Sequence, residues 1–317
     1  MIWIAICLIA GAVMLYFGSE WLVRGAKGLA LNLGVAPFVI GLTVLAFGSS
    51  APEAITSIVS TSNPQIIIGN VVGSNIANIG LAIGLAAVLG PMAAIYKDMK
   101  LEIWVMLLAS VLLCCLGLIG SVGYIVGIPL ILSLFVFLYV VFKKKKADKE
   151  GRAVYEEEVT IDTLRTPVLT LLCVVGLVLL YFGAKYFIEG AKGLAQILGA
   201  SDLIIGLVVV AIGTSLPEIC ISLLAARRGE ADLAVANIVG SNIFNILFVL
   251  GIGASLVDIP ISQSMVGFHM PMMLLLSVTM FLIVRFKNRI DRRSGFVLLG
   301  IYAVYFIAIA LNPSLMF

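Results

Sequence analysis

Ten long apolar runs fill most of the 317-residue chain and restrict what it can fold into. Each run has about 20 residues, the length that an α-helix needs to cross the apolar core of a bilayer. Hydrophobic residues make up 62% of the sequence and charged residues 12%, whereas soluble domains are about half apolar and about a quarter charged. The chain is therefore predicted to be an all-α polytopic membrane protein, which excludes a soluble enzyme, a disordered protein and a disulfide-rich secreted module. The predicted spans cover residues 2–23, 37–60, 66–90, 101–120, 122–142, 167–189, 202–226, 232–256, 265–285 and 295–315.

The Lys and Arg residues predict the side of the membrane on which each connecting segment lies. If the N-terminus is outside, 18 of the 20 basic residues fall in cytoplasmic segments, and only Lys185 and Lys192 fall outside. Basic residues accumulate on the cytoplasmic side of membrane proteins, and an even number of spans places both termini on one side. We therefore expect an N-out, C-out, multi-pass protein of the cell's inner (plasma) membrane.

Two stretches of the first half recur in the second half. Residues 16–53 match residues 181–218 at 20 of 38 positions, and residues 69–80 match residues 236–247 at 8 of 12 positions, in both cases without gaps. The matched residues include Gly, Pro, Glu, Ser and Asn, which an apolar composition alone would not align. The chain therefore contains an internal repeat.

Each repeat contains five spans, and an odd number means that the second copy enters the membrane from the opposite side. The prediction is a first five-helix repeat in residues 1–142, a charged cytoplasmic loop in 143–166 and a second, inverted five-helix repeat in 167–317. Inverted repeats are typical of secondary transporters, in which the substrate site lies near the midplane where the repeats meet.

Two glutamates lie deep inside apolar spans at matching repeat positions, Glu53 in GSSAPE and Glu218 in GTSLPE. A buried carboxylate costs several kcal/mol unless it is paired with a cation or protonated. A pair of protonated, hydrogen-bonded glutamic acids is the plain alternative, but two symmetric copies favour a cation site. Hydroxyl groups three and four residues earlier share a helix face with each glutamate; they belong to Ser49 and Ser50, and to Thr214 and Ser215.

Pro52 and Pro217 directly precede the glutamates, and Gly48 and Gly213 lie nearby. Proline lacks the N–H that the helical hydrogen-bond ladder needs, so each helix is predicted to kink or unwind at this point. Unwinding inside a protected cavity frees backbone carbonyl groups to bind ions.

The second recurring motif reads GSNIANIG in the first half and GSNIFNIL in the second. It places a hydroxyl and an amide four residues apart on one helix face, in the pairs Ser74 with Asn78 and Ser241 with Asn245. Gly73 and Gly240 are expected to allow a neighbouring helix to approach closely. Four further amides can either hydrogen-bond broken backbone or bind an ion directly; they are Asn70, Asn75, Asn237 and Asn242.

Carboxylate, amide, hydroxyl and backbone carbonyl oxygens are all hard ligands. No Cys or His accompanies them, which disfavours zinc, copper and iron. Two carboxylates neutralise one divalent ion, and a flexible site of this kind suits Ca²⁺ better than Mg²⁺ and also suits Na⁺. We expect no cofactor.

These paired motifs resemble the two α-repeats of the cation/Ca²⁺ antiporter superfamily, and most closely its sodium/calcium exchanger branch in the short prokaryotic form. The resemblance extends over essentially the whole chain. It implies Na⁺-driven Ca²⁺ antiport, with a core of the second, third, seventh and eighth helices and long, tilted first and sixth helices that slide against it.

The resemblance also implies the roles of individual residues. Ca²⁺ would be bound by Glu53 and Glu218 with the backbone carbonyls of Ser49 and Thr214. The Na⁺ ligands would be the same two glutamates, the side chains of Ser50, Ser74, Ser215 and Ser241, and the carbonyls of Ala46 and Ala211. Asn78 and Asn245 would complete a central site that holds water or an ion.

Two departures from the family pattern bear on selectivity. Ser49 stands where members often carry Thr, and Asn245 stands where some relatives carry Asp. Because that Asp is linked to K⁺ use in the potassium-dependent branch, the resemblance implies K⁺ independence. The proton-coupled branch typically carries a GNxxE-type motif, so GSSAPE and GTSLPE favour sodium coupling.

Three other functions remain open or are disfavoured on the residues alone. Ca²⁺/H⁺ antiport through the same glutamates is the main alternative. A channel fits twinned midplane glutamates less well than alternating access does. No Ser/Lys, Ser/His or HExxH arrangement supports an intramembrane enzyme. The expected partners are Ca²⁺, Na⁺ and the lipid bilayer, without nucleic acid, and a monomer is expected to suffice for function.

Overall fold

The computed structural model describes residues 2–146, 164–197, 211–312 and 315. The helices of the first half are α1 (Ile2–Leu33), α2 (Pro37–Ile40), α3 (Ala46–Ser49), α4 (Ala51–Val59), α5 (Gln65–Ala77), α6 (Gly84–Leu89), α7 (Tyr96–Gly117) and α8 (Tyr124–Lys146). Those of the second half are α10 (Thr166–Ile197), α12 (Ala211–Thr214), α13 (Leu216–Arg227), α14 (Ala231–Phe244), α15 (Leu250–Leu256), α16 (Met270–Lys287) and α17 (Arg292–Leu311). Among the described residues, four π-helical turns interrupt the spans: η1 (Gly41–Leu45), η2 (Asn78–Ile83), η4 (Asn245–Val249) and η5 (Met265–His269).

Nine helical segments in the described part of the chain are long and apolar enough to cross a membrane. Each overlaps one of the ten predicted spans, which confirms the polytopic helical fold. The predicted span 202–226 is described only from residue 211 onward, where it forms α12 and α13. α8 continues through Lys146, so the predicted loop 143–166 begins with helix, and residues 147–163 of that loop lie outside the described residues.

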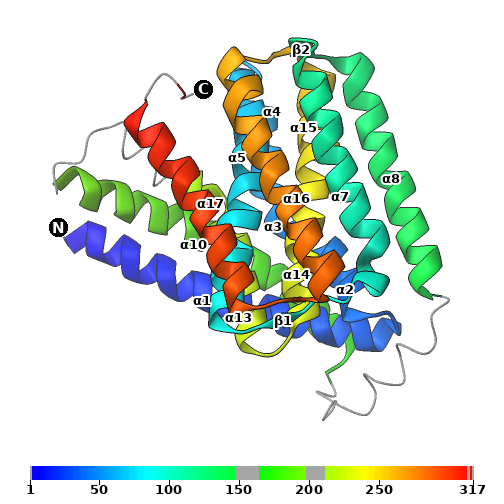
Figure 1. The fold of residues 1–317 in the computed structure, drawn as a ribbon. Helices are drawn as coiled ribbons and strands as arrows, with labels where there is room; N and C mark the ends of the chain where they lie inside the picture. Colours follow the sequence, from blue (N-terminus) through cyan, green and yellow to red (C-terminus); the bar gives the residue numbers. More distant parts are fainter. Residues whose placement is uncertain (1, 147–163, 198–210, 313–314, 316–317) are drawn as a thin grey trace.

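The first and sixth helices are longer than their predicted spans. α1 and α10 each contain 32 residues, about 48 Å at 1.5 Å per residue, against a bilayer core of roughly 30 Å. The predicted ends at residues 23 and 189 were wrong because charged residues interrupt the apolar run while the helix continues. Helices of this length must tilt strongly to stay within the bilayer, and Figure 1 shows α1 and α10 side by side, steeply inclined to the rest of the bundle.

Glycines bring α1 and α10 together. A Cβ added to Gly18 would lie 2.9 Å from the carbonyl oxygen of Gly176, and one added to Gly183 would lie 2.8 Å from the backbone nitrogen of Leu15. Helices that lack Cβ atoms at such points can pack backbone to backbone. Residues later in α1 contact residues earlier in α10, so the two helices run antiparallel. Inverted repeats require this arrangement.

The remaining helices pack across the two halves in matching pairs. α7 lies against α16, α8 against α15, and α17 against α6. Two short antiparallel ribbons also join the halves, β1 (Met92–Ala93) with β4 (Arg289–Ile290) and β2 (Ser121–Val122) with β3 (Ile259–Pro260). The spans Gln65–Leu89 and Ala231–Leu256 form the centre of this bundle, since 78% and 94% of their most apolar stretches are buried.

The expected close approach at the motif glycines is seen at Gly240, where an added Cβ would lie 2.6 Å from both the Leu42 carbonyl oxygen and the Ala46 Cβ. The equivalent neighbours of Gly73 would be residues 207 and 211 of the second half. Residue 207 and the side chain of residue 211 lie outside what the structure describes, so the expectation for Gly73 stays a prediction.

Cysteine labelling can test the predicted orientation. Lys27 and Lys192 occupy the same position of the repeated GAKGLA sequence, and inverted halves place them on opposite faces of the membrane. In a background without native cysteines, a cysteine at 27 should react with an impermeant thiol reagent from the cytoplasm, and one at 192 from outside. Labelling of both from the same side would mean that the halves are parallel.

Candidate functional site

Each span that carries a glutamate is divided into two helices by a single non-helical residue. This residue directly precedes the helix that contains the glutamate. Ser50 separates α3 from α4 with φ −87° and ψ 6°, and Ser215 separates α12 from α13 with φ −89° and ψ 6°. Pro52 and Pro217 stand within the first two positions of the new segments, where a missing N–H costs little. The predicted interruption is therefore confirmed in both halves, with the same geometry.

Glu53 and Glu218 lie in the first turns of α4 and α13. Both side chains are only 1% exposed. Free backbone N–H groups at a helix N-terminus favour negative charge, so each break gives its carboxylate a suitable electrostatic setting. The Ser50 hydroxyl donates a 3.1 Å hydrogen bond to Oε1 of Glu218, which brings the motif of the first half into direct contact with the glutamate of the second.

Two reciprocal hydrogen bonds join the asparagines of the two halves. Asn78 donates from Nδ2 to Oδ1 of Asn242 at 3.0 Å, and Asn245 donates from Nδ2 to Oδ1 of Asn75 at 3.1 Å. Asn78 and Asn245 are also the first residues of the π-helical turns η2 and η4. Such turns displace the hydrogen-bond ladder locally and often occur at functional sites.

The other two motif asparagines hold neighbouring segments in place. Asn70 donates to the backbone carbonyl of Glu53 at 3.4 Å, and Asn237 donates to the Ser222 hydroxyl at 3.3 Å. The amide groups of both asparagines therefore hydrogen-bond to neighbouring groups of the protein, and direct ion binding by the four further amides stays a prediction.

Several buried oxygens in and beside the two repeated motifs have no hydrogen-bond partner among the described residues. A buried polar atom left without a partner costs about 1–3 kcal/mol, and more if it is charged. This cost is removed when a cation binds, and every atom concerned is a hard oxygen of the kind that Ca²⁺ and Na⁺ prefer. The atoms are both carboxylate oxygens of Glu53, Oε2 of Glu218, the hydroxyls of Ser57, Ser74, Ser215 and Ser241, and the amide oxygens of Asn78 and Asn245.

Four predicted ligands remain to be located, and they are Ala46, Ser49, Ala211 and Thr214. The Ser49 hydroxyl lies 3.4 Å from the Ala46 carbonyl oxygen and 3.4 Å from Oδ1 of Asn237. The Ala46 carbonyl also accepts the N–H of Ser50 at 3.1 Å. Thr214 ends α12 on the wall of a cavity. Ala211 is the first described residue of that segment.

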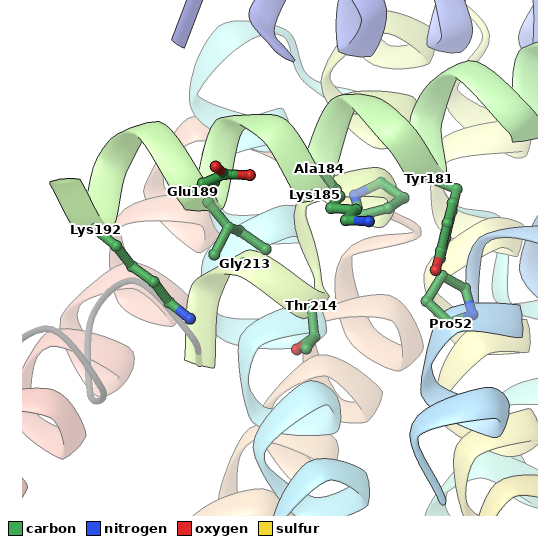
Figure 2. Close-up of a pocket in the computed structure, with 10 residues that line it drawn as sticks. Pro52, Tyr181, Ala184, Lys185, Glu189, Lys192, Gly213 and Thr214 are labelled. Carbon is green, nitrogen blue, oxygen red and sulfur yellow. The ribbon is translucent and has the colours of Figure 1, made fainter. Parts of the chain in front are cut away.

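A cavity of about 370 Å³ lies beside the two helix breaks. Pro52 and Pro217 form part of its wall, so both helix breaks face it. Figure 2 shows α10 above the cavity, with Lys185, Glu189 and Lys192 along it and Gly213 and Thr214 below. Oε1 of Glu189 accepts a 3.1 Å hydrogen bond from the indole N–H of Trp3 on α1. This cavity could not be predicted from the sequence, because its charged residues are spread over one face of a helix whose predicted span ended at 189.

Two features of the site have chemical consequences. Within the described residues, no three His, Cys, Asp or Glu side chains lie together as a metal cluster, so the candidate ligands are mainly neutral oxygens with two carboxylates. The oxygens also come from both halves of the chain, so a displacement of one half against the other would change the coordination.

Known proteins resemble this chain along nearly its whole length. It matches the family described as sodium/calcium exchanger protein over residues 3–143 and 168–311. The sodium/calcium exchanger MaX1 of Methanosarcina acetivorans is 32% identical over 343 aligned positions, covering 95% of this chain and 97% of the relative. The putative antiporter CaxA of Alkalimonas amylolytica is 37% identical, covering 95% and 96%.

A solved structure shares the fold. The sodium-calcium exchanger NCX_Mj, soaked with 10 mM Na⁺ and 10 mM Sr²⁺, superposes with a TM-score of 0.83 at 33% identity, covering 98% of each chain. The predicted all-α polytopic membrane fold and the prediction of a transporter rather than an enzyme are thereby confirmed. By sequence and by structure, this chain is a multi-pass membrane protein that belongs to the sodium/calcium exchanger family.

Proposed function

We propose that this protein exchanges Na⁺ for Ca²⁺ across the plasma membrane at a site built on Glu53 and Glu218. The observation that carries the proposal is the group of partnerless buried oxygens around these two carboxylates. Na⁺ and Ca²⁺ would compete for overlapping oxygens, so the binding of one ion species displaces the other.

The two carboxylates balance one Ca²⁺, with the carbonyls of Ser49 and Thr214 as further ligands. The Na⁺ ions would use the same glutamates with hydroxyls contributed by both halves, from Ser50, Ser74, Ser215 and Ser241, and the carbonyls of Ala46 and Ala211. Asn78 and Asn245 supply amide oxygens at the centre. Because the ligands come from inverted halves, a rocking or sliding displacement can expose the same site to either face in turn. One copy of the chain contains the complete ligand set, so a monomer suffices.

Independence from K⁺ is part of the proposal. Asn245 donates an amide hydrogen to Asn75, and its own oxygen has no partner among the residues that the structure describes. A neutral amide there leaves two carboxylates in the site rather than three, so no additional monovalent cation is needed to balance the charge.

The alternative is Ca²⁺/H⁺ antiport, in which Glu53 and Glu218 would take up protons instead of Na⁺. Reconstituting the full-length protein in liposomes separates the two. Radioactive Ca²⁺ uptake is measured while Na⁺, K⁺ and H⁺ gradients are imposed one at a time. A Na⁺ gradient at clamped pH should drive saturable uptake, and a K⁺ gradient should not. Uptake driven by the H⁺ gradient alone would establish the alternative, and flux without any counter-ion would indicate a channel.

A further inference from the structure

Two ion pairs tie α1 to the corner between α13 and α14. Lys27 pairs with Glu230, and Glu20 pairs with Arg228. The side chains are partly buried, with exposed fractions between 18% and 38%. The partners lie more than 200 residues apart in sequence, and each pair joins the first half of the chain to the second.

The equivalent positions of the second half are arranged differently. Glu20 and Lys27 align with Lys185 and Lys192 of α10, which line the 370 Å³ cavity instead. The corner that α10 would approach, between α4 and α5, reads STSNPQ over residues 60–65 and carries no charge, whereas the corner between α13 and α14 reads RRGEAD over 227–232. Of these two corners, only the one between α13 and α14 offers carboxylate and guanidinium partners.

We propose that Glu20, Lys27, Arg228 and Glu230 form an ionic clamp that holds α1 closed over α13 and so favours the state in which the site opens beside α10. The proposal rests on the alternating access proposed above. The four residues are positioning residues, since none of them contacts the ion ligands. Because the corner between α4 and α5 carries no charge, closure of α10 over that corner gains no comparable electrostatic contribution.

The clamp predicts the direction of a population shift. A partly exposed ion pair contributes about 0.2–1 kcal/mol, so the loss of one pair should change the ratio of the two states by about fivefold at most. Neutralising one residue of a pair should increase the fraction of molecules that are open beside α1. It should decrease the fraction that are open beside α10 by the same amount. High salt should act in the same direction, because mobile ions screen partly exposed pairs.

Two reporter cysteines at equivalent positions can measure the shift. Ile188 lines the α10 cavity, and Val23, its repeat equivalent on α1, is 1% exposed. In a background without native cysteines, the thiol at 188 should react readily with an impermeant reagent and the thiol at 23 slowly. Arg228→Gln should raise the labelling rate at 23 and lower the rate at 188, so that the ratio of the two rates changes by about threefold. The double variant Glu20→Arg with Arg228→Glu should restore the parent rates.

Arg227→Gln serves as the matched control. This neighbouring arginine is exposed and forms no part of the clamp, so its loss should leave both rates at the parent values. A rise at position 23 without a fall at 188 would mean that the ion pairs merely stabilise the local fold, and unchanged rates in Arg228→Gln would also overturn the proposal. Labelling requires no ion flux, so a negative result here is distinct from a failure of Na⁺/Ca²⁺ exchange.

Discussion

Replacing either Glu53 or Glu218 with glutamine should lower Na⁺-driven Ca²⁺ exchange by at least about 100-fold. The substitution keeps the size of the side chain and removes half of the negative charge that offsets the lost hydration of the ion. Breaking one half of a buried charge pair typically costs about 3–5 kcal/mol, and each 1.4 kcal/mol corresponds to about tenfold in an equilibrium constant. Both residues are buried to the same degree, so the two variants should lose exchange to a similar extent.

The measurement is Ca²⁺ uptake into liposomes under an imposed Na⁺ gradient, accompanied by thermal unfolding in detergent with and without Ca²⁺. A ligand that binds only the native state raises the unfolding temperature. The glutamine variants should unfold at or above the parent temperature in the absence of Ca²⁺, because an unpaired buried charge has been removed, and they should lose the increase that Ca²⁺ produces. Glu156→Gln, in the charged segment between the repeats, should behave as the parent. Parent-rate exchange in Glu53→Gln or Glu218→Gln would refute the site.

Replacing Asn245 with aspartate should make Ca²⁺ flux depend on pH or on K⁺, with a change of about tenfold between the extremes, while coupling to Na⁺ is retained. A third carboxylate beside two others in a medium of low dielectric constant cannot ionise freely. It must take up a proton or recruit another monovalent cation. The structure adds a local reason. Asn245 donates a hydrogen bond to Oδ1 of Asn75. An ionised aspartate at 245 has no hydrogen to donate, so two acceptor oxygens would face each other. A protonated aspartate restores the hydrogen bond.

Na⁺-driven uptake at two pH values, with and without K⁺, tests this second expectation. Asn32→Asp provides the control, since Asn32 lies near the end of α1 and hydrogen-bonds to Leu164 and Thr166, away from the site. If Asn245→Asp and the parent share the same dependence on pH and K⁺, Asn245 does not face the ion cavity.

The parts of the site that local chemistry dictates could be predicted from the sequence. Proline and glycine beside each buried glutamate predicted the breaks at Ser50 and Ser215, because these residues act within their own helix. The spacing of Ser74 and Asn78 likewise placed both side chains on one helix face. Neither inference requires knowledge of what packs against the helix.

Features that depend on distant neighbours could not be predicted in this way. The continuation of α1 beyond residue 23 depends on Gly25 and Gly28, which pack against α10, so charge and hydropathy alone end the span too early. The exchange of hydrogen bonds between Asn75 and Asn245 and the ion pair between Lys27 and Glu230 both join segments about 170 or more residues apart. Only the assembled bundle shows these contacts.

The glycines of the α1–α10 crossing recur at a fixed interval. On α1 they are Gly11, Gly18 and Gly25, and on α10 they are Gly176, Gly183 and Gly190, each seven residues from the next. Seven residues of α-helix span about 10.5 Å, so the contact surface has a translational period of that length. A displacement by one full period would present glycine to the same kind of neighbour again, whereas a fraction of a period would press side chains against backbone. The glycine spacing therefore makes a displacement of about 10.5 Å along this crossing sterically easier than a smaller one.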